Sequence, residues 1–368
     1  MQKQINKETR KKIIIVNYIC CILVVLIHSS GYKYFDLSDC GKIGLLMKYI
    51  IDIFIKYLPQ VSVSMFFVIS GFLFFKDFSI EEPFSIKKFF EKWKSRIKTL
   101  FIPYLLWNII WMGFIAIVSN VSWIRLHIES LGLFEYSVKN VLQGIFLYKY
   151  AGITWYLFYL ILYGLLSPLF FILLKSKYGK VFILVASFIF SGINKNILIY
   201  YSPAHFNSLF FYILGAYLAI YKFEAVNKRY NRKFLMTGIW GGIIITALIS
   251  FDIKNQWIIE GIRLLGVCFL WFLSEAFVNK NIYWWMEISF FIYVFHGLTQ
   301  QCINKIISII LPNNGIFSAA CAFINTFVGM ILTILLANTI AFLLIRWAKP
   351  LWMLLTGKRI PRNLENKF

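Results

Sequence analysis

The chain has 368 residues, of which 60% are hydrophobic and 15% charged, and its 38 basic and 16 acidic side chains give a formal net charge of +22. Soluble domains average about 45–50% apolar and about 25% charged residues, so the composition excludes a soluble globular protein. Long apolar runs recur between residues 13 and 346. Because a membrane span needs about 20 apolar residues, these runs predict an all-α polytopic membrane protein of about ten transmembrane helices.

The apolar runs predict individual spans. The first, residues 13–27, follows a basic segment and lacks the small-residue cleavage pattern of a signal peptide, so we expect a retained first helix. Residues 44–58 are apolar too, but Lys48, Asp52 and Lys56 recur every four residues, which favours a helix lying at the membrane interface. The other predicted spans lie near residues 60–75, 99–119, 153–174, 180–198, 206–222, 235–250, 256–278, 282–298 and 317–346.

Basic residues are distributed unevenly between alternate loops. With the N-terminus inside, the inner segments carry 27 basic residues and the outer segments ten, while Arg263 lies within a span. Cytoplasmic loops are enriched in basic residues, so both termini are expected in the cytoplasm. The predicted parts are a cytoplasmic segment 1–12, a transmembrane domain 13–346 and a basic cytoplasmic tail 347–368. The positive charge is therefore mainly a sign of topology, and no nucleic-acid partner is expected.

One basic cluster exceeds what topology requires, at the start of the third predicted span. Its members are Lys87, Lys88, Lys92, Lys94, Arg96 and Lys98. Two interpretations fit it: contact with anionic lipid, or binding of a phosphorylated cytoplasmic ligand.

Histidine is scarce, with four in the chain. His28 and His296 fall inside or at the end of predicted spans, where an ionisable ring usually faces a cavity or a partner. Imidazole can accept and return a proton near neutral pH, so either could be a catalytic base, or simply a hydrogen-bonded structural histidine. The cysteines and histidines show no metal-ligand spacing, and no metal is expected.

Six segments resemble the motifs of one family. The stretch NYICCILVVLIHSSG at 17–31 matches an opening motif in which ten residues separate an arginine from a histidine; His28 matches, but Asn17 stands in place of the arginine. The others are SVSMFFVISGFLFF at 62–75, RIKTLFIPYLLWN at 96–108, TWYLFYLILYGLLSPL at 154–169, FYILGAYLAIY at 211–221 and ISFFIYVFHGL at 288–298. In this order they resemble the acyltransferase 3 family of integral membrane O-acyltransferases.

The resemblance implies an enzyme of the bacterial plasma membrane. It would move an acyl group, usually acetyl, from cytoplasmic acyl-CoA to a hydroxyl of a cell-envelope carbohydrate or its lipid-linked precursor. The expected partners are acyl-CoA, the glycan acceptor and the bilayer, and no permanently bound cofactor is expected beyond acetyl-CoA or another acyl-CoA as donor substrate. Asn17 and His28 are eleven residues apart, about 16 Å along a helix, so His28 should lie toward the outer face.

Each candidate residue has an expected role. We expect His28 to be the general base for the acceptor hydroxyl; a covalent acyl-histidine intermediate is the alternative. Asn17 can hydrogen-bond at the inner mouth of the donor path but supplies no charge, which Lys12 or Arg10 would have to replace. The phosphates of CoA are expected at Lys92, Lys94, Arg96 and Lys98.

Further polar or aromatic residues are candidates for lining the substrate path. These are Ser70, Trp155, Glu260, Arg263 and His296, the last with Gln300 and Gln301 one turn on. Each also has a structural explanation: small-residue packing beside Gly71, an interfacial aromatic belt, an ion pair between residues three apart, or a partnered helix-end histidine.

Two other function classes remain open at this point. A transporter or exporter of envelope glycans would have a similar composition, and so would a non-catalytic membrane recognition module. Loss of all transfer in His28→Ala would distinguish the enzyme.

Overall fold

The computed structural model describes residues 4–37, 40–57, 59–121, 134–193, 206–250, 255–313 and 317–365. Every regular element within these ranges is a helix, so the predicted all-α class is confirmed. In these described ranges, six helical segments are long and apolar enough to cross a membrane: Lys7–Tyr34, Gly41–Phe75, Ile86–Asn120, Gly152–Lys175, Gln256–Phe277 and Phe317–Trp347. Shorter apolar helices cover Gly179–Gly192, Ser208–Tyr221 and Lys233–Ile245. The chain is thus a multi-pass membrane protein.

Each of the ten predicted spans overlaps a helix, whereas the number that cross the bilayer stays a prediction. The helices are α1 (Lys7–Ile27), α3 (Gln60–Phe75), α5 (Ile102–Asn120), α8 (Trp155–Lys175), α9 (Gly179–Gly192), α10 (Phe206–Tyr221), α12 (Arg232–Ser250), α13 (Gln256–Leu273), α15 (Ser289–Ile310) and α16 (Phe317–Trp347). The other α-helices of the described residues are α2 (Gly41–Asp52), α4 (Ile86–Arg96), α7 (Val138–Phe146), α11 (Phe223–Val226), α14 (Trp284–Glu287), α17 (Lys349–Thr356) and α18 (Arg362–Glu365).

The limits predicted for the span at 282–298 were wrong. Trp284–Glu287 forms the separate short helix α14, and α15 begins at Ser289 and continues to Ile310. Hydropathy falls after Leu298, but no glycine or proline interrupts the chain between there and Pro312. Since backbone hydrogen bonding needs only the absence of a helix breaker, α15 extends 12 residues beyond its apolar part.

The chain divides into two compact units that alternate along the sequence. Unit 1 contains Met1–Cys20, Gln60–Ile97 and Tyr159–Met286, and unit 2 contains Cys21–Pro59, Lys98–Phe158 and Glu287–Phe368. Helices α1 and α8 each pass from one unit into the other.

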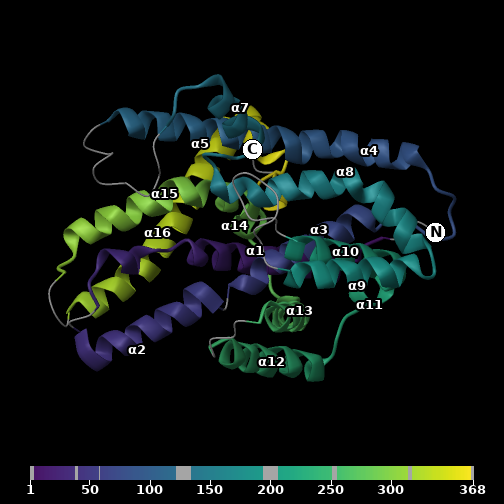
Figure 1. Cartoon of the computed structure of the whole chain (residues 1–368), viewed down its shortest axis with the longest axis horizontal. Helices are drawn as coiled ribbons and strands as arrows, with labels where there is room; N and C mark the ends of the chain where they lie inside the picture. Colours follow the sequence, from purple (N-terminus) through teal and green to yellow (C-terminus); the bar gives the residue numbers. More distant parts are fainter. Residues whose placement is uncertain are drawn as a thin grey trace. The chain divides into compact units, whose positions relative to one another are not determined.

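Unit 1 is built around the pair α3 and α10, which lie side by side (Figure 1). A Cβ atom at Gly71 would lie 2.1 Å from the carbonyl oxygen of Tyr212, and one at Gly215 would lie 2.0 Å from that of Val68. Such distances leave no room for any side chain, so the two glycines let the helix backbones touch. Helices α9 and α13 also pack in this unit, and α12 packs on α13.

Unit 2 centres on α15 and α16, which run next to each other (Figure 1). Helix α2 packs on α16, and one apolar cluster joins Leu26, Phe35, Ile51, Ile55, Cys321 and Ala322. Ile43, Leu45, Leu46 and Tyr49 of α2 stay exposed. The placement of this segment at the membrane interface stays a prediction.

Replacing Gly71 by alanine should destabilise the protein. The new methyl group would overlap the Tyr212 carbonyl, and overpacking of this kind costs about 1–3 kcal/mol. Gly261→Ala is the matched control, because Gly261 is also helical in unit 1 and a Cβ there meets nothing within 4 Å. We expect a lower unfolding temperature for Gly71→Ala and an unchanged or higher one for Gly261→Ala, measured by intrinsic fluorescence in detergent. Equal unfolding temperatures in the two variants would contradict the close-packing assignment.

Candidate functional site

Two of the histidines singled out in the sequence lie together in unit 2. His28 follows the last residue of α1, and His296 lies on α15. Their ring centroids are 5.2 Å apart, with the ring planes tilted by 42°. His28 is exposed, whereas His296 is fully buried. His28 is thus accessible to a substrate, whereas His296 is enclosed by the protein.

The hydrogen bonding of His296 determines where its proton resides. Its Nδ1 atom lies 2.5 Å from the carbonyl oxygen of Tyr293. A carbonyl can only accept, so Nδ1 carries the hydrogen and donates it, and Nε2 is left as an acceptor. This buried Nε2 atom has no hydrogen-bond partner among the described residues. Nε2 of His296 is therefore a buried acceptor that could receive a hydrogen bond.

The 3-10 turn Gly152–Thr154, just before α8, is hydrogen-bonded to the turn of α15 that contains His296. The hydroxyl of Tyr293 donates a hydrogen bond to the carbonyl of Ile153, two residues before Trp155. Thr154 is fully buried and donates to Oδ1 of Asn108 at 2.6 Å. Trp155 itself is half-buried at the start of α8. These bonds position Trp155 in unit 2, the unit that contains the histidine pair.

Two residues of unit 2 with unpartnered polar atoms, Trp111 and Asn304, were not singled out in the sequence. Trp111 of α5 packs its six-membered ring against Gly297, where a Cβ would lie 2.5 Å from the ring, and its buried Nε1–H has no acceptor among the described residues. On α15, Gln300 and Asn304 are buried and follow His296 at intervals of four residues. Gln300 was named in the sequence, but Asn304 fell outside the predicted span. The spacing of four residues between His296, Gln300 and Asn304, which places them on one helix face, could have indicated Asn304.

Glu260 and Arg263 form the ion pair that their spacing on α13 suggested. Arg263 donates to Oε1 of Glu260 at 2.5 Å and to Oε1 of Gln60 at 2.6 Å, and Gln256 donates to the same glutamate oxygen at 2.8 Å. Glu260 is fully buried. This shared set of hydrogen bonds joins α13 to the start of α3 inside unit 1, as the structural explanation expects, and a role of the pair in lining a substrate path stays a prediction.

Two further candidates, Ser70 and Asn17, also belong to unit 1. Both are half-buried, Ser70 on α3 and Asn17 on α1. Ser70 directly precedes Gly71, which makes the close approach to α10. Their roles in binding substrate stay predictions.

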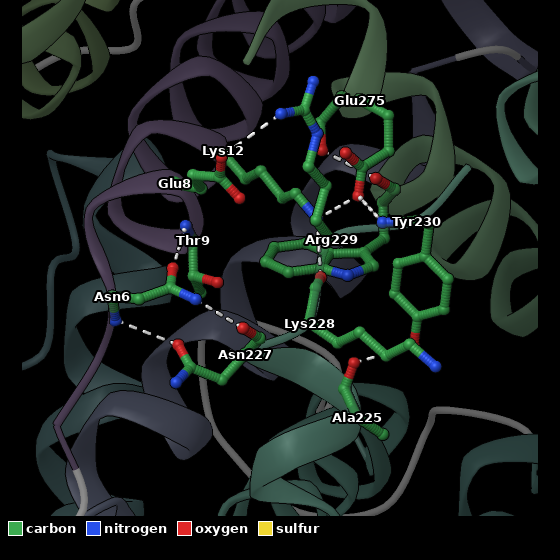
Figure 2. A network of polar contacts seen from close by, with 12 residues as sticks. Asn6, Glu8, Thr9, Lys12, Ala225, Asn227, Lys228, Arg229, Tyr230 and Glu275 are labelled. Carbon is green, nitrogen blue, oxygen red and sulfur yellow. Dashed lines mark hydrogen bonds and ion pairs between the residues drawn. The ribbon is translucent and has the colours of Figure 1, made fainter. Parts of the chain in front are cut away.

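Lys12 lies in a buried polar network of unit 1 (Figure 2). Its ammonium group forms an ion pair with Glu275 and donates to the carbonyl oxygen of Lys228 at 3.0 Å, and both side chains are almost wholly buried. Glu275 also accepts from the backbone N–H of Tyr230 at 3.1 Å. The expectation that Lys12 replaces the missing arginine is therefore not supported, because its charge is already neutralised. Arg10, the other candidate, is exposed.

The basic cluster divides into engaged and accessible members. Lys92 pairs with Asp77 at 2.5 Å, Lys88 pairs with Glu82 at 2.7 Å, and the Arg96 guanidinium lies over the ring of Phe74. Lys94 and Lys98 are exposed. Among the described residues, no ion pair includes either of these two lysines. Lys87 is exposed as well, so a phosphorylated ligand would find its accessible charges at Lys87, Lys94 and Lys98.

The carboxylate of Asp77, which pairs with Lys92, has a lowered pKa. Burial acts to raise the pKa of Asp77, but hydrogen bonds and positive charge from Lys76 and Lys92 outweigh it and hold the pKa below its usual value. A carboxylate with a lowered folded-state pKa contributes stability that is lost as the pH falls through that value. At neutral pH Asp77 is thus ionised and its ion pair with Lys92 is formed.

Comparison with known proteins decides the family. A family model described as an acyltransferase domain matches residues 11–346, nearly the whole chain. The chain belongs to the acyltransferase 3 family. No curated protein and no solved structure gives a match. The family and the apolar helices together make the chain a membrane acyltransferase, in which the histidine pair of unit 2 is the candidate centre.

Removing one partner of the Lys12–Glu275 pair should destabilise this acyltransferase strongly. Lys12→Met leaves Glu275 buried without its cation, and such losses cost about 3–5 kcal/mol. The double variant Lys12→Met with Glu275→Leu buries no charge and should recover most of the loss. Unfolding temperatures of the two single variants and the double variant, in one detergent, give the coupling. Strictly additive effects would mean that the two side chains do not interact.

Proposed function

We propose that the chain transfers an acyl group, acetyl in the simplest case, from cytoplasmic acyl-CoA to a hydroxyl of a cell-envelope carbohydrate or its lipid-linked precursor, in the plasma membrane of a bacterium. One observation carries the proposal: the exposed ring of His28 stands 5.2 Å from the buried ring of His296, in a chain of the acyltransferase 3 family. Transfer to an alcohol needs a group that takes its proton, and His28 is the accessible candidate.

The proposed reaction is direct transfer with His28 as general base. The ring takes the proton of the acceptor hydroxyl while the hydroxyl oxygen forms a bond to the thioester carbonyl carbon. The C–S bond then breaks, and the leaving CoA thiolate takes the proton from the imidazolium. His296 would act through His28, as a neutral ring that positions it.

The developing oxyanion requires hydrogen-bond donors. The Nε1–H of Trp111 is a buried donor without an acceptor among the described residues, and its ring packs on the residue next to His296. A donor that is already fixed in place needs no rearrangement when the oxyanion forms, so Trp111 is our candidate for this role.

Charge at the cytoplasmic end would hold the phosphates of the donor. Of the four residues expected to bind them, Lys94 and Lys98 are exposed, whereas Arg96 is half-buried and Lys92 is held by Asp77. Asn17 would contribute a hydrogen bond at the inner end of α1. No permanently bound cofactor is needed for this chemistry.

His28→Ala should abolish acyl transfer while the protein still folds. The purified protein is incubated with radiolabelled acetyl-CoA, with and without envelope extract, and label transfer and CoA release are measured. Loss of a positioned general base lowers rates by about 10²–10⁴-fold. Thr339→Val is the control, because this exposed hydroxyl on α16 bonds only its own helix. Full activity in His28→Ala would contradict the assignment, and absence of transfer in the wild type would favour a transporter.

Neutralising Lys94 and Lys98 together should weaken donor binding. A charge-assisted hydrogen bond contributes about 1.5–3 kcal/mol, so Lys94→Gln with Lys98→Gln should raise KM for acetyl-CoA at least about tenfold, with a smaller effect on kcat. Lys88→Gln removes one charge from the same cluster, but Lys88 is already paired with Glu82, and its KM should stay near wild type. Equal changes in both variants would mean that the cluster acts only through its net charge.

A further inference from the structure

Helix α15 carries three buried polar side chains on one face. His296, Gln300 and Asn304 are spaced four residues apart, and their exposed fractions are 0%, 1% and 0%. Both polar atoms of the Gln300 amide and both of the Asn304 amide lack a hydrogen-bond partner among the described residues, as does Nε2 of His296. Residues four apart lie above one another on a helix, so these five atoms line a single stripe.

This stripe is energetically expensive for a membrane helix. A buried donor or acceptor left without a partner costs about 1–3 kcal/mol, and leucine at positions 300 and 304 would avoid that cost. Most buried polar groups in proteins are satisfied, so several consecutive exceptions on one face point to a ligand that satisfies them.

The surroundings of Asn304 are built to accommodate its amide. A Cβ at Gly329 of α16 would lie 1.9 Å from Oδ1 of Asn304, so only glycine leaves room for that atom. Asn325, also on α16, donates from Nδ2 to the backbone carbonyl of Asn304 at 3.0 Å and to that of Gly31 at 3.3 Å. Asn325 thereby ties this turn of α15 to the segment that follows His28, while the Asn304 side chain keeps its own polar atoms available.

We propose that Gln300 and Asn304 bind the non-reacting hydroxyls of a polyhydroxylated, carbohydrate-type acceptor whose reacting hydroxyl meets His28. This inference rests on the function proposed above. An amide group both donates and accepts, as a hydroxyl does, so a row of amides fits a polyol better than it fits an acyl chain. The two amides lie about 6 and 12 Å along the axis beyond His296. In the expected topology that direction leads to the outer face, opposite to the entry of the donor.

A binding experiment can test the stripe without relying on catalysis. The full chain is placed in lipid nanodiscs, and its unfolding temperature is followed by tryptophan fluorescence during titration with octyl β-glucoside, below its micellar concentration, or with 1-octanol. The two alcohols share the same alkyl chain and differ in the number of hydroxyls. We expect the glucoside to stabilise the wild type at concentrations at least about tenfold lower than octanol does.

The variant Gln300→Leu with Asn304→Leu should lose this preference. Its half-maximal glucoside concentration should rise at least about tenfold, its octanol response should stay the same, and without ligand it should be at least as stable as the wild type, because the unpartnered amides are gone. Asn338→Leu is the control: it removes another unpartnered amide oxygen of α16, 13 residues after Asn325, and should keep the full glucoside response.

Three results would overturn the proposal. These are an equal response of the wild type to both alcohols, an unchanged glucoside response in the double leucine variant, and a loss of stability in that variant without a change in its glucoside preference. Acetyl transfer measured on the same samples separates this inference from the proposed reaction. Absence of transfer to either alcohol, together with a glucoside response that depends on Gln300 and Asn304, would refute the reaction and leave the polyol site standing.

Discussion

The hydrocarbon core of a membrane supplies no water, so each polar side chain placed there depends on the protein or on a ligand for its hydrogen bonds. In unit 1 this constraint is met with opposite charges: Glu275 neutralises Lys12, and Glu260 neutralises Arg263. On α15 in unit 2, Nε2 of His296 and the amides of Gln300 and Asn304 have no partner among the described residues, although these side chains are buried as deeply. The charges of unit 1 thus have partners, whereas the unpartnered atoms on α15 cost stability, as strained groups at binding sites do.

Glycine allows close approach in both units, with different results. In unit 1, Gly71 and Gly215 remove side chains from the contact of α3 with α10, so that backbone meets backbone. In unit 2, Gly297 admits the indole of Trp111 and Gly329 admits the amide of Asn304. The glycines of unit 2 thus make room for polar side chains, and an alanine there would move a candidate functional group.

Hydropathy was sufficient to predict the fold class and to locate a helix under every expected span. It failed at the end of α15, because a helix can continue past its apolar part where no residue breaks it, and Asn304 therefore fell outside the predicted span. His28 and His296 could be chosen singly, since each is an ionisable group in an apolar run. Their 5.2 Å approach could not be predicted, because it depends on a contact between residues 268 positions apart. The ion pair between Lys12 and Glu275 could not be predicted either, because these residues are also far apart in the sequence.

If the donor is acyl-CoA, as proposed, the asparagine at position 17 changes where this chain can hold the donor's charge. An arginine there would bring a cation into α1, whereas Asn17 is neutral and half-buried. Lys12, about one turn nearer the N-terminus, cannot compensate, because releasing its ammonium group would leave Glu275 buried and unpaired. Of the residues expected to hold the phosphates of CoA, the exposed ones are then Lys94 and Lys98, at the start of another helical segment. In the proposed reaction, binding of acyl-CoA should accordingly depend on these surface lysines and be more sensitive to salt than binding by a buried arginine, since exposed charges are screened much more than buried ones.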